Sequence, residues 1–301
     1  MEAAHFVIFV DFVVPTLKSQ LKTYMKLTFK EKSILPGFGL SLGVTVFSLS
    51  LIVLLPLSAL LLRSSRAGFS GFLETLSQPR VIAAFKVTFS SALQAALINV
   101  VLGIVVAWFL VRGRFPLKRL VDALVDLPFA MPTAVSGIAL TALFAPNAPL
   151  GAFLAQHGFP VAFTPRGITL AMIFVGLPFV IRNVQPALAD LSRDLEEAAN
   201  SLGATRFQTL TRVVLPLLLP SILSGFTLAF SRALGEYGSV VFIAGNLPLK
   251  TEIVSLLIIT KLESFDVTGA TVLAVALLGL SFVSLFLINL LQARTAKYFG
   301  N

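Results

Sequence analysis

The segment "LEEAANSLGATRFQTLTRVVLP", residues 195–216, separates two long apolar runs, and this arrangement decides the fold. The segment carries acids, arginines and glutamine at helical spacing, whereas its flanks are almost free of charge. A polar amphipathic insert between two apolar runs predicts a chain that leaves the bilayer and then returns to it. The apolar flanks therefore predict membrane spans, and the polar insert between them is expected to act outside the membrane.

The composition supports a membrane protein. The chain has 301 residues, of which 56% are hydrophobic and 12% are charged, and its mean hydropathy is +0.93. Soluble domains carry about 25% charged residues, so we expect membrane lipid to be the solvent of most of this chain. The formal charge is +9, but the cations lie in short loops between apolar runs. That placement sets membrane topology, and no nucleic acid partner is expected.

The sequence lacks the residues and motifs that disulfides, metal sites, nucleotide binding and common hydrolytic catalysis require. The chain has no cysteine and only two histidines, so neither disulfides nor a metal site is expected. The sequence contains no GxxxxGKS/T phosphate-binding loop, and it contains no HExxH or GxSxG motif. We therefore predict no catalytic residues, no enzyme activity and no cofactor bound by this chain.

Six apolar segments are long enough to cross a bilayer, which needs about 20 residues. They predict an all-α polytopic membrane protein with six transmembrane helices, because a chain in lipid must satisfy its backbone hydrogen bonds internally. The segments are 39–62, 84–111, 123–145, 167–188, 213–235 and 268–292.

The distribution of lysine and arginine between the loops predicts the orientation of the chain in the membrane. The side that holds the N-terminal tail, the 112–122 loop, the insert and the C-terminal end carries twice as many of these residues as the other side. The richer side should be cytoplasmic, so we expect a multi-pass protein of the bacterial inner (plasma) membrane with both termini and the insert in the cytoplasm. The predicted organisation is a cytoplasmic or interfacial segment 1–38, a transmembrane domain 39–292 and a cytoplasmic tail 293–301. Within the domain we expect a core at 82–292 and an insert at 189–212.

The insert is expected to form two short helices. Asp194 is the expected N-cap of the first, with Glu197 three residues later, and Gly203 ends that helix. Thr205 and Gln208 predict a capping box for the second helix. The apolar stripes are Leu195, Ala199 and Leu202 in the first helix and Phe207, Leu210 and Val214 in the second.

A helix this short is not stable alone in water, so its apolar stripe needs a surface to lie on. One candidate is a groove in a protein partner, and the other is the lipid headgroup region. The insert has few cations, and it carries Asp194, Glu196 and Glu197, which anionic lipid would repel. A cytoplasmic protein partner is therefore the favoured interpretation.

The spacing within the insert resembles the EAA motif of ABC importer permeases. That motif is EAA, three residues, Gly, nine residues and then I-x-L-P, and only Val213 departs from it. The corresponding positions in this chain are Glu197, Ala198, Ala199, Gly203, Val213, Leu215 and Pro216. The resemblance implies that the first short helix is a coupling helix, seated in a cleft of a separate ATPase subunit. ATP would then be used by that partner.

Other stretches widen the resemblance, which runs from about Ser33 to about Arg294. They are "SILPGFGLSLG" (33–43), "DALVDLPFAMPTAVSGIAL" (122–140), "FVIRNVQPAL" (179–188), "FSRALGEYGSVVFIAGN" (230–246) and "KTEIVSLLI" (250–258). Together they are similar to the T subunits of sulfate/thiosulfate permeases. This resemblance implies a type I importer fold. It also implies three kinds of partner: a homologous second permease of the W type, two ATPase subunits and a periplasmic sulfate-binding protein.

Charges within the predicted spans raise a separate question. Arg182 lies in the fourth span, and Arg232 lies near the end of the fifth, with Glu236 one turn later. One interpretation is an anion pathway, which Ser231 would also line. The other is structural: Arg232 pairs with Glu236, and Arg182 extends to the cytoplasmic surface. Asp122 and Asp126 are expected to be ordinary interfacial acids.

Two alternatives to a sulfate importer stay open. Related molybdate permeases share the EAA region and the "ALGE" stretch, so a molybdate or tungstate permease is the first alternative. An ion-driven secondary transporter is the second, but such proteins are built from two similar halves, and no clear repeat is visible in this sequence. The sequence does not distinguish a bacterial from a plastid host.

Overall fold

The computed structural model describes residues 38–299, and every regular element in that range is a helix. The all-α prediction is confirmed. Most of the predicted N-terminal segment 1–38 and the last two residues of the tail lie outside the described residues. The chain divides into two compact units, Met1–Leu57 and Ser58–Asn301.

The described part of the first unit is one apolar helical run. It contains α2 (Phe38–Leu49), a π-helical turn η1 (Ser50–Leu54) and the beginning of α3 (Leu55–Ser64). Most of the large apolar side chains between residues 40 and 55 are exposed. A run of exposed apolar side chains on a helix is the pattern that a lipid-facing span requires.

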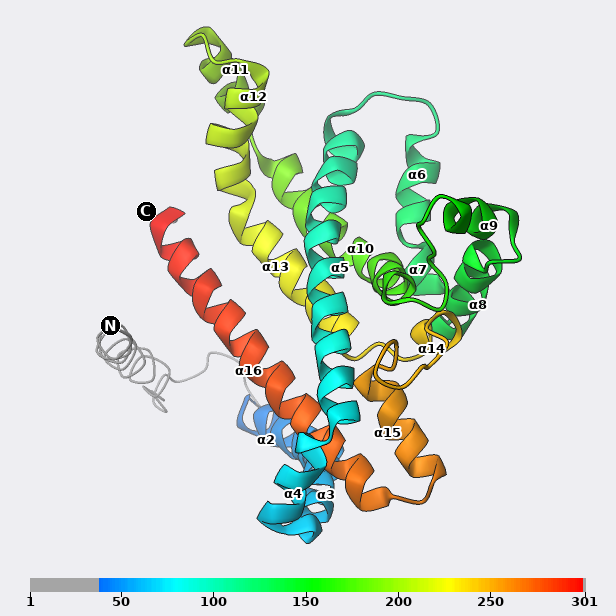
Figure 1. Cartoon of the computed structure of the whole chain (residues 1–301). Coiled ribbons are helices and arrows are strands. Elements are labelled where there is room, and N and C mark those ends of the chain that lie inside the picture. The colour runs from blue at the N-terminus through cyan, green and yellow to red at the C-terminus, as the bar shows by residue number, and fades with distance from the viewer. Residues whose placement is uncertain (1–37, 300–301) are drawn as a thin grey trace, which may run out of the picture. The chain divides into compact units, whose positions relative to one another are not determined.

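The second unit contains the remaining helices, which are arranged around α5 (Figure 1). Their bounds are η2 Ser65–Ala67, α4 Gly68–Ser77, α5 Pro79–Arg112, α6 Lys118–Val125, α7 Leu127–Ala130, α8 Thr133–Phe144, α9 Pro149–Gln156, α10 Pro165–Asp190, α11 Arg193–Ser201, α12 Arg206–Thr209, η3 Leu210–Val214, α13 Leu215–Leu234, α14 Val240–Ile243, α15 Val254–Glu263 and α16 Val267–Phe299. Helices α5 and α10 each begin with proline, whose fixed φ suits the first position of a helix.

Five of the six predicted spans correspond to helical runs that are long and apolar enough to cross a membrane. These runs are Gly39–Ser77, Pro79–Arg112, Pro165–Asp190, Arg206–Leu234 and Val267–Ala293. The third prediction, one helix over 123–145, is wrong. The chain there forms α6, α7 and α8, because Pro128 and Pro132 lack the N–H that a continuous helix needs. A sixth crossing is available only as the pair α8 and α9, which is bent by 58°.

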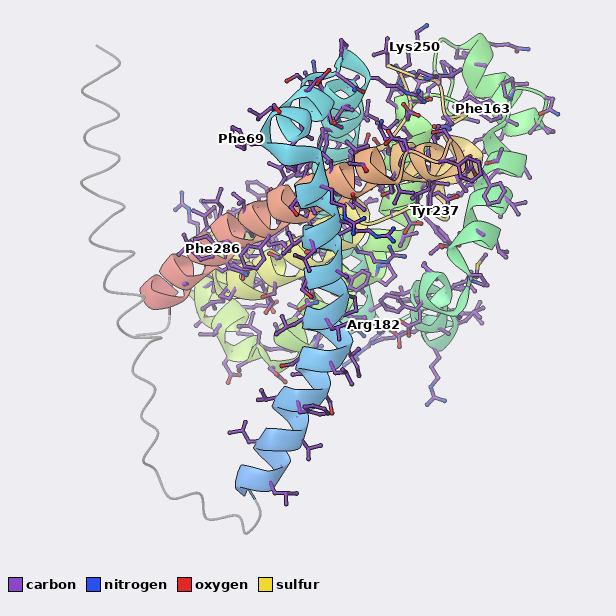
Figure 2. The ribbon with its side chains drawn as sticks, turned by 90° about the horizontal axis from the view of Figure 1, so that it is seen from below. Phe69, Phe163, Arg182, Tyr237, Lys250 and Phe286 are labelled. Atoms are coloured by element: carbon purple, nitrogen blue, oxygen red, sulfur yellow. The ribbon has the colours of Figure 1, made fainter. Side chains whose placement is uncertain are left out.

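Helices α5, α10 and α13 form the centre of the second unit, and small residues let them approach closely. A Cβ on Gly103 of α5 would lie 2.6 Å from Val180 Cγ1 of α10, and one on Gly225 of α13 would lie 2.8 Å from Val180 Cα. Close backbone approach at small residues is a usual way to pack helices in lipid. On the outside, Phe69 of α4 and Phe286 of α16 are exposed, as Figure 2 shows.

Candidate functional site

The amphipathic insert forms the two short helices expected of it, α11 and α12, at one end of the second unit (Figure 1). The N-cap of α11 is Ser192, whose Oγ accepts from the Asp194 N–H at 3.2 Å. The prediction that Asp194 caps the helix is therefore wrong by two residues. Asp194 instead lies in the first turn, where its charge favours the positive end of the helix dipole.

Gly203 makes the turn between the two helices. Its φ is +83°, in the left-handed region that glycine adopts without strain. Its N–H donates to Asn200 O at 2.9 Å, and the Ala204 N–H donates to Ala199 O at 3.0 Å. These bonds satisfy carbonyls at the end of α11. The position requires glycine for its backbone conformation, because nothing lies within 4 Å of a Cβ built there.

The second helix begins with the predicted capping box, which is confirmed. Thr205 Oγ1 accepts from the Gln208 N–H at 3.3 Å, and Gln208 Oε1 accepts from the Thr205 N–H at 2.8 Å. After only four residues α12 passes into the π-helical turn η3, which leads directly into α13. The insert is thus continuous with the fifth predicted span, so α12 and α13 are linked by helical backbone.

The two helices expose apolar side chains. Leu195 is 43% exposed, Leu202 is 89% exposed and Phe207 is 73% exposed. At the base of α13 the pattern changes, because Val214 is buried while its neighbours Val213, Leu215 and Pro216 are half-buried. Of the EAA residues, Glu197 and Ala198 are exposed and Ala199 is half-buried. One end of the motif therefore anchors the insert, and the other presents a free surface.

An ion pair that the sequence did not indicate ties the insert to α5. Arg112, the last residue of α5, donates from Nη2 to Glu196 Oε1 at 2.7 Å and to the Leu191 carbonyl at 3.0 Å. Both side chains of the ion pair are more than three-quarters buried. The available signal was topological: the positive-inside rule puts the end of α5 and the insert on one side of the membrane. It does not say which cation meets which acid.

Arg182 of α10 binds two aspartates: Asp122 of α6, and Asp126, which lies between α6 and α7. Its Nε and Nη2 donate to the two oxygens of Asp126 at 2.8 and 2.6 Å, and its Nη1 donates to Asp122 Oδ1 at 2.7 Å and to Gln185 Oε1 at 2.7 Å. Figure 2 labels this arginine. A guanidinium that donates two parallel hydrogen bonds to one carboxylate is held in a fixed orientation.

This cluster corrects the expectation that Asp122 and Asp126 are ordinary interfacial acids. Their i, i+4 spacing puts both on one face of the chain, and that spacing was the missed signal. The hydrogen bond from Arg182 is the main reason that the pKa of Asp122 is lowered, against the opposing effect of burial. Asp122 therefore stays ionised, and its ion pair with Arg182 joins α6 to α10.

Arg232 and Glu236 form the ion pair that was one of the two interpretations. Arg232 Nη1 lies 2.6 Å from Glu236 Oε2, and the Glu236 side chain is 1% exposed. The other oxygen of Glu236 accepts from the N–H and the hydroxyl of Ser239, both at 2.9 Å. Ser231 donates to the Thr227 carbonyl of its own helix at 2.6 Å. Glu236 thus links Arg232 in the last turn of α13 to Ser239, the residue before α14.

No group of three or more His, Asp and Glu side chains in the described range is placed to hold a metal ion. The features on hand are an apolar helical membrane unit, buried or half-buried ion pairs within it, and a capped amphipathic insert at one end. Together they define the class: a polytopic helical membrane protein with a polar insert between two spans.

Comparison with known proteins gives the family. Residues 99–297 match the family described as binding-protein-dependent transport system inner membrane component, and the chain belongs to that family of ABC transporter permeases. The chain is 47% identical to the sulfate transport system permease protein CysT of Salmonella typhimurium over 271 residues, covering 90% of this chain and 98% of that protein. It is 48% identical to the Escherichia coli protein of the same name, covering 89% and 96%.

Solved structures agree on the fold. A chain in the crystal structure of a bacterial alginate ABC transporter, in complex with an alginate pentasaccharide-bound periplasmic protein, superposes with a TM-score of 0.70 at 18% identity. The match covers 85% of this chain and 94% of that one. A chain of an inward-facing methionine ABC transporter gives a TM-score of 0.55 at 18% identity, covering 72% and 96%. The predicted type I ABC importer permease fold is confirmed.

Proposed function

We propose that this chain is the transmembrane permease subunit of an ATP-driven importer of sulfate or thiosulfate. The observation that carries the proposal is the 47% identity over 271 residues to a protein named as a sulfate transport permease, a match that spans 98% of that protein. Similarity over nearly the whole length includes the spans and the insert together. The chain's role is transport, and the nucleotide chemistry belongs to partner ATPase subunits.

The insert is the proposed link to those ATPases. Leu195, Leu202 and Phe207 give α11 and α12 an exposed apolar face, and helices this short need a groove to stabilise them. The coupling residues are those of the EAA motif: Glu197, Ala198, Ala199, Gly203, Val213, Leu215 and Pro216. ATP-driven closure of two ATPase subunits would move α11, and α12 would pass that movement into α13 through η3.

The remaining partners follow from the same family. They are a homologous second permease, which shares the translocation pathway, and a periplasmic sulfate-binding protein, which delivers the anion. The proposed topology keeps the insert and both termini in the cytoplasm, because the Lys and Arg excess lies on that side. The proposed domain boundaries are those predicted from the sequence, with a core at 82–292 and a coupling insert at 189–212.

Transport then requires two states of the permease pair. A ligand shifts an equilibrium only by binding one state more tightly than the other. We expect ATP to favour a cavity that opens to the periplasm, and nucleotide release to favour one that opens to the cytoplasm. The second permease would complete that cavity.

The test is reconstitution of the complete transporter, with its ATPases and binding protein, into liposomes. Uptake of labelled sulfate should require ATP on the side of the liposome membrane where the ATPase subunits are bound. It should continue when ion gradients are collapsed. Uptake driven by an ion gradient without ATP would establish the secondary transporter instead. Stimulation of ATP hydrolysis by molybdate or tungstate, but not by sulfate or thiosulfate, would move the assignment to the first alternative.

A further inference from the structure

A groove lined by Arg166 lies at the end of α10 that is farthest from the insert. Its volume is about 370 Å³, and its lining comes from α5, the end of α8, the segment leading into α10 and the first turns of α10. The polar lining residues are Ser90, Ser91, Gln94, Arg166 and Thr169, and no Asp or Glu is among the lining residues. The groove therefore has one positive charge and no negative one.

We infer that this groove is a binding subsite for the transported oxyanion, an inference that rests on the proposed function. A tetrahedral oxyanion needs hydrogen-bond donors and positive charge on one side, and a guanidinium supplies both in a planar fork. Arg166 and the groove's hydroxyl and amide groups have that composition.

Arg166 is available to a ligand, whereas Arg182 and Arg232 are not. Arg182 is held by two aspartates and Arg232 by the buried Glu236. Within residues 38–299, Arg166 has no carboxylate partner: it stacks 4.0 Å from the centre of the Phe159 ring and makes one long bond of 3.4 Å to the Gly158 carbonyl. The stacking fixes the guanidinium while leaving most of its N–H groups free.

Neighbouring groups add donors. Ser91 is 2% exposed, and its hydroxyl has no hydrogen-bond partner among the described residues. The exposed amide of Gln94 lies one turn further along α5 and is likewise without one there. The amino end of α10 begins at Pro165 beside them, and its dipole adds positive potential to the groove.

The depth of the groove also fits a transport role. Arg166 lies at the start of α10, whose 26 residues span about 39 Å at 1.5 Å per residue, and the insert follows the other end of that helix. That span is comparable with the roughly 30 Å of a bilayer core. With the insert in the cytoplasm, the groove opens near the periplasmic side, where an anion delivered by a binding protein enters. A single charge makes the site weak, as passage requires.

The first test is transport by the complete reconstituted transporter carrying Arg166→Gln. We expect sulfate uptake to fall about tenfold, roughly the contribution of a charge-assisted bond, while binding-protein-stimulated ATP hydrolysis stays within about twofold of wild type. Arg166→Lys should retain part of the uptake. Lys86→Gln, which removes an exposed cation of α5 outside the groove, should leave it unchanged. Normal uptake by Arg166→Gln would overturn the inference.

The second test measures anion binding without transport. The chain has no cysteine, so Gln94→Cys gives one thiol in the groove and Ser264→Cys gives an exposed control elsewhere. Sodium sulfate should slow the reaction of the groove thiol with N-ethylmaleimide, compared with sodium chloride at equal ionic strength. The control thiol should not respond. Equal rates in the two salts, or protection that persists after Arg166→Gln, would count against the site.

The third arm separates sulfate from a lipid phosphate, which has the same tetrahedral oxygens. Both assays are repeated in liposomes with and without anionic phospholipid. If the effects of Arg166→Gln appear only when anionic lipid is present, the ligand is a headgroup and the inference fails. If wild type itself shows no ATP-dependent sulfate uptake, the proposed function fails, and the labelling assay still decides whether the groove binds an oxyanion.

Discussion

Arg112 Nη2 and Glu196 Oε1 lie 2.7 Å apart, joining the last residue of α5 to the first turn of α11. The two residues are 84 positions apart in the chain. The insert is therefore fixed to two spans, to α13 through its backbone and to α5 through an ion pair. A movement of α11 driven by an ATPase would act on both.

Charge reversal of this pair should uncouple ATP hydrolysis from transport. Arg112→Glu places two carboxylates together and removes the bond to the Leu191 carbonyl. We expect sulfate uptake per ATP hydrolysed to fall severalfold in reconstituted transporter, with normal insertion of the chain into the membrane. The double variant Arg112→Glu with Glu196→Arg should recover part of the loss, corresponding to a coupling energy on the order of 1 kcal/mol. Additive losses in the double variant would show that the pair has no role in coupling.

Gly203 should tolerate substitution according to backbone preference and not side-chain size. Its φ of +83° costs a β-branched residue roughly 1–2 kcal/mol, whereas asparagine adopts this region more readily. We expect Gly203→Val to lower both transport and binding-protein-stimulated ATP hydrolysis, and Gly203→Asn to keep most of both. Full activity in the valine variant would show that the turn between α11 and α12 is not needed for coupling.

Glu236 should matter for stability more than for the passage of anions. Its side chain is 1% exposed and accepts from Arg232 and from the Ser239 N–H and hydroxyl. Glu236→Ala leaves the buried N–H and hydroxyl of Ser239 without an acceptor and the partly exposed Arg232 without its counter-charge, and we expect a loss of about 2 kcal/mol. Thermal unfolding of the purified chain in detergent measures it. The amide of Glu236→Gln keeps one acceptor and should lose less.

Asp266 should give a pH-dependent contribution to stability. Its pKa is lowered because Lys261 donates to its side chain and, to a lesser extent, because the Gly269 N–H does. The folded state thus holds the carboxylate more strongly than the unfolded chain, whose Asp pKa is about 3.9. The stabilisation is present above that pH and is lost as the pH falls through the lower folded value.

The matching variant is Asp266→Ala, which also removes the bond to Gly269 at the start of α16. It should cost about 1 kcal/mol near pH 7, the usual value for a helix cap. The difference in melting temperature from wild type should shrink as the pH is lowered past about 4. A difference independent of pH would mean that the ionised carboxylate is not the stabilising species. Lys261→Met is the control for the ion pair, and it should show a smaller loss.

Local signals in the sequence predicted local structure well. The Thr205 and Gln208 spacing predicted a capping box that forms, and Gly203 predicted the turn, because both depend on residues within one helical turn. Prediction failed where a local signal had two solutions. Ser192 took the N-cap in place of Asp194, since either side chain can accept from a nearby N–H. Pro128 and Pro132 divide the predicted third span among three helices, α6, α7 and α8, because neither proline has the N–H that a continuous helix needs.

The sequence by itself determined that this chain is a helical membrane protein with a polar insert between two apolar runs. Those properties follow from the transfer of apolar side chains into lipid and from backbone hydrogen bonding, which act residue by residue. Only the tertiary structure decided that Arg182 is held by Asp122 and Asp126, that Arg112 reaches Glu196, and that Arg166 lines a groove without a carboxylate. An ion pair forms between residues that packing brings within about 4 Å, and no pattern along the sequence contains that distance.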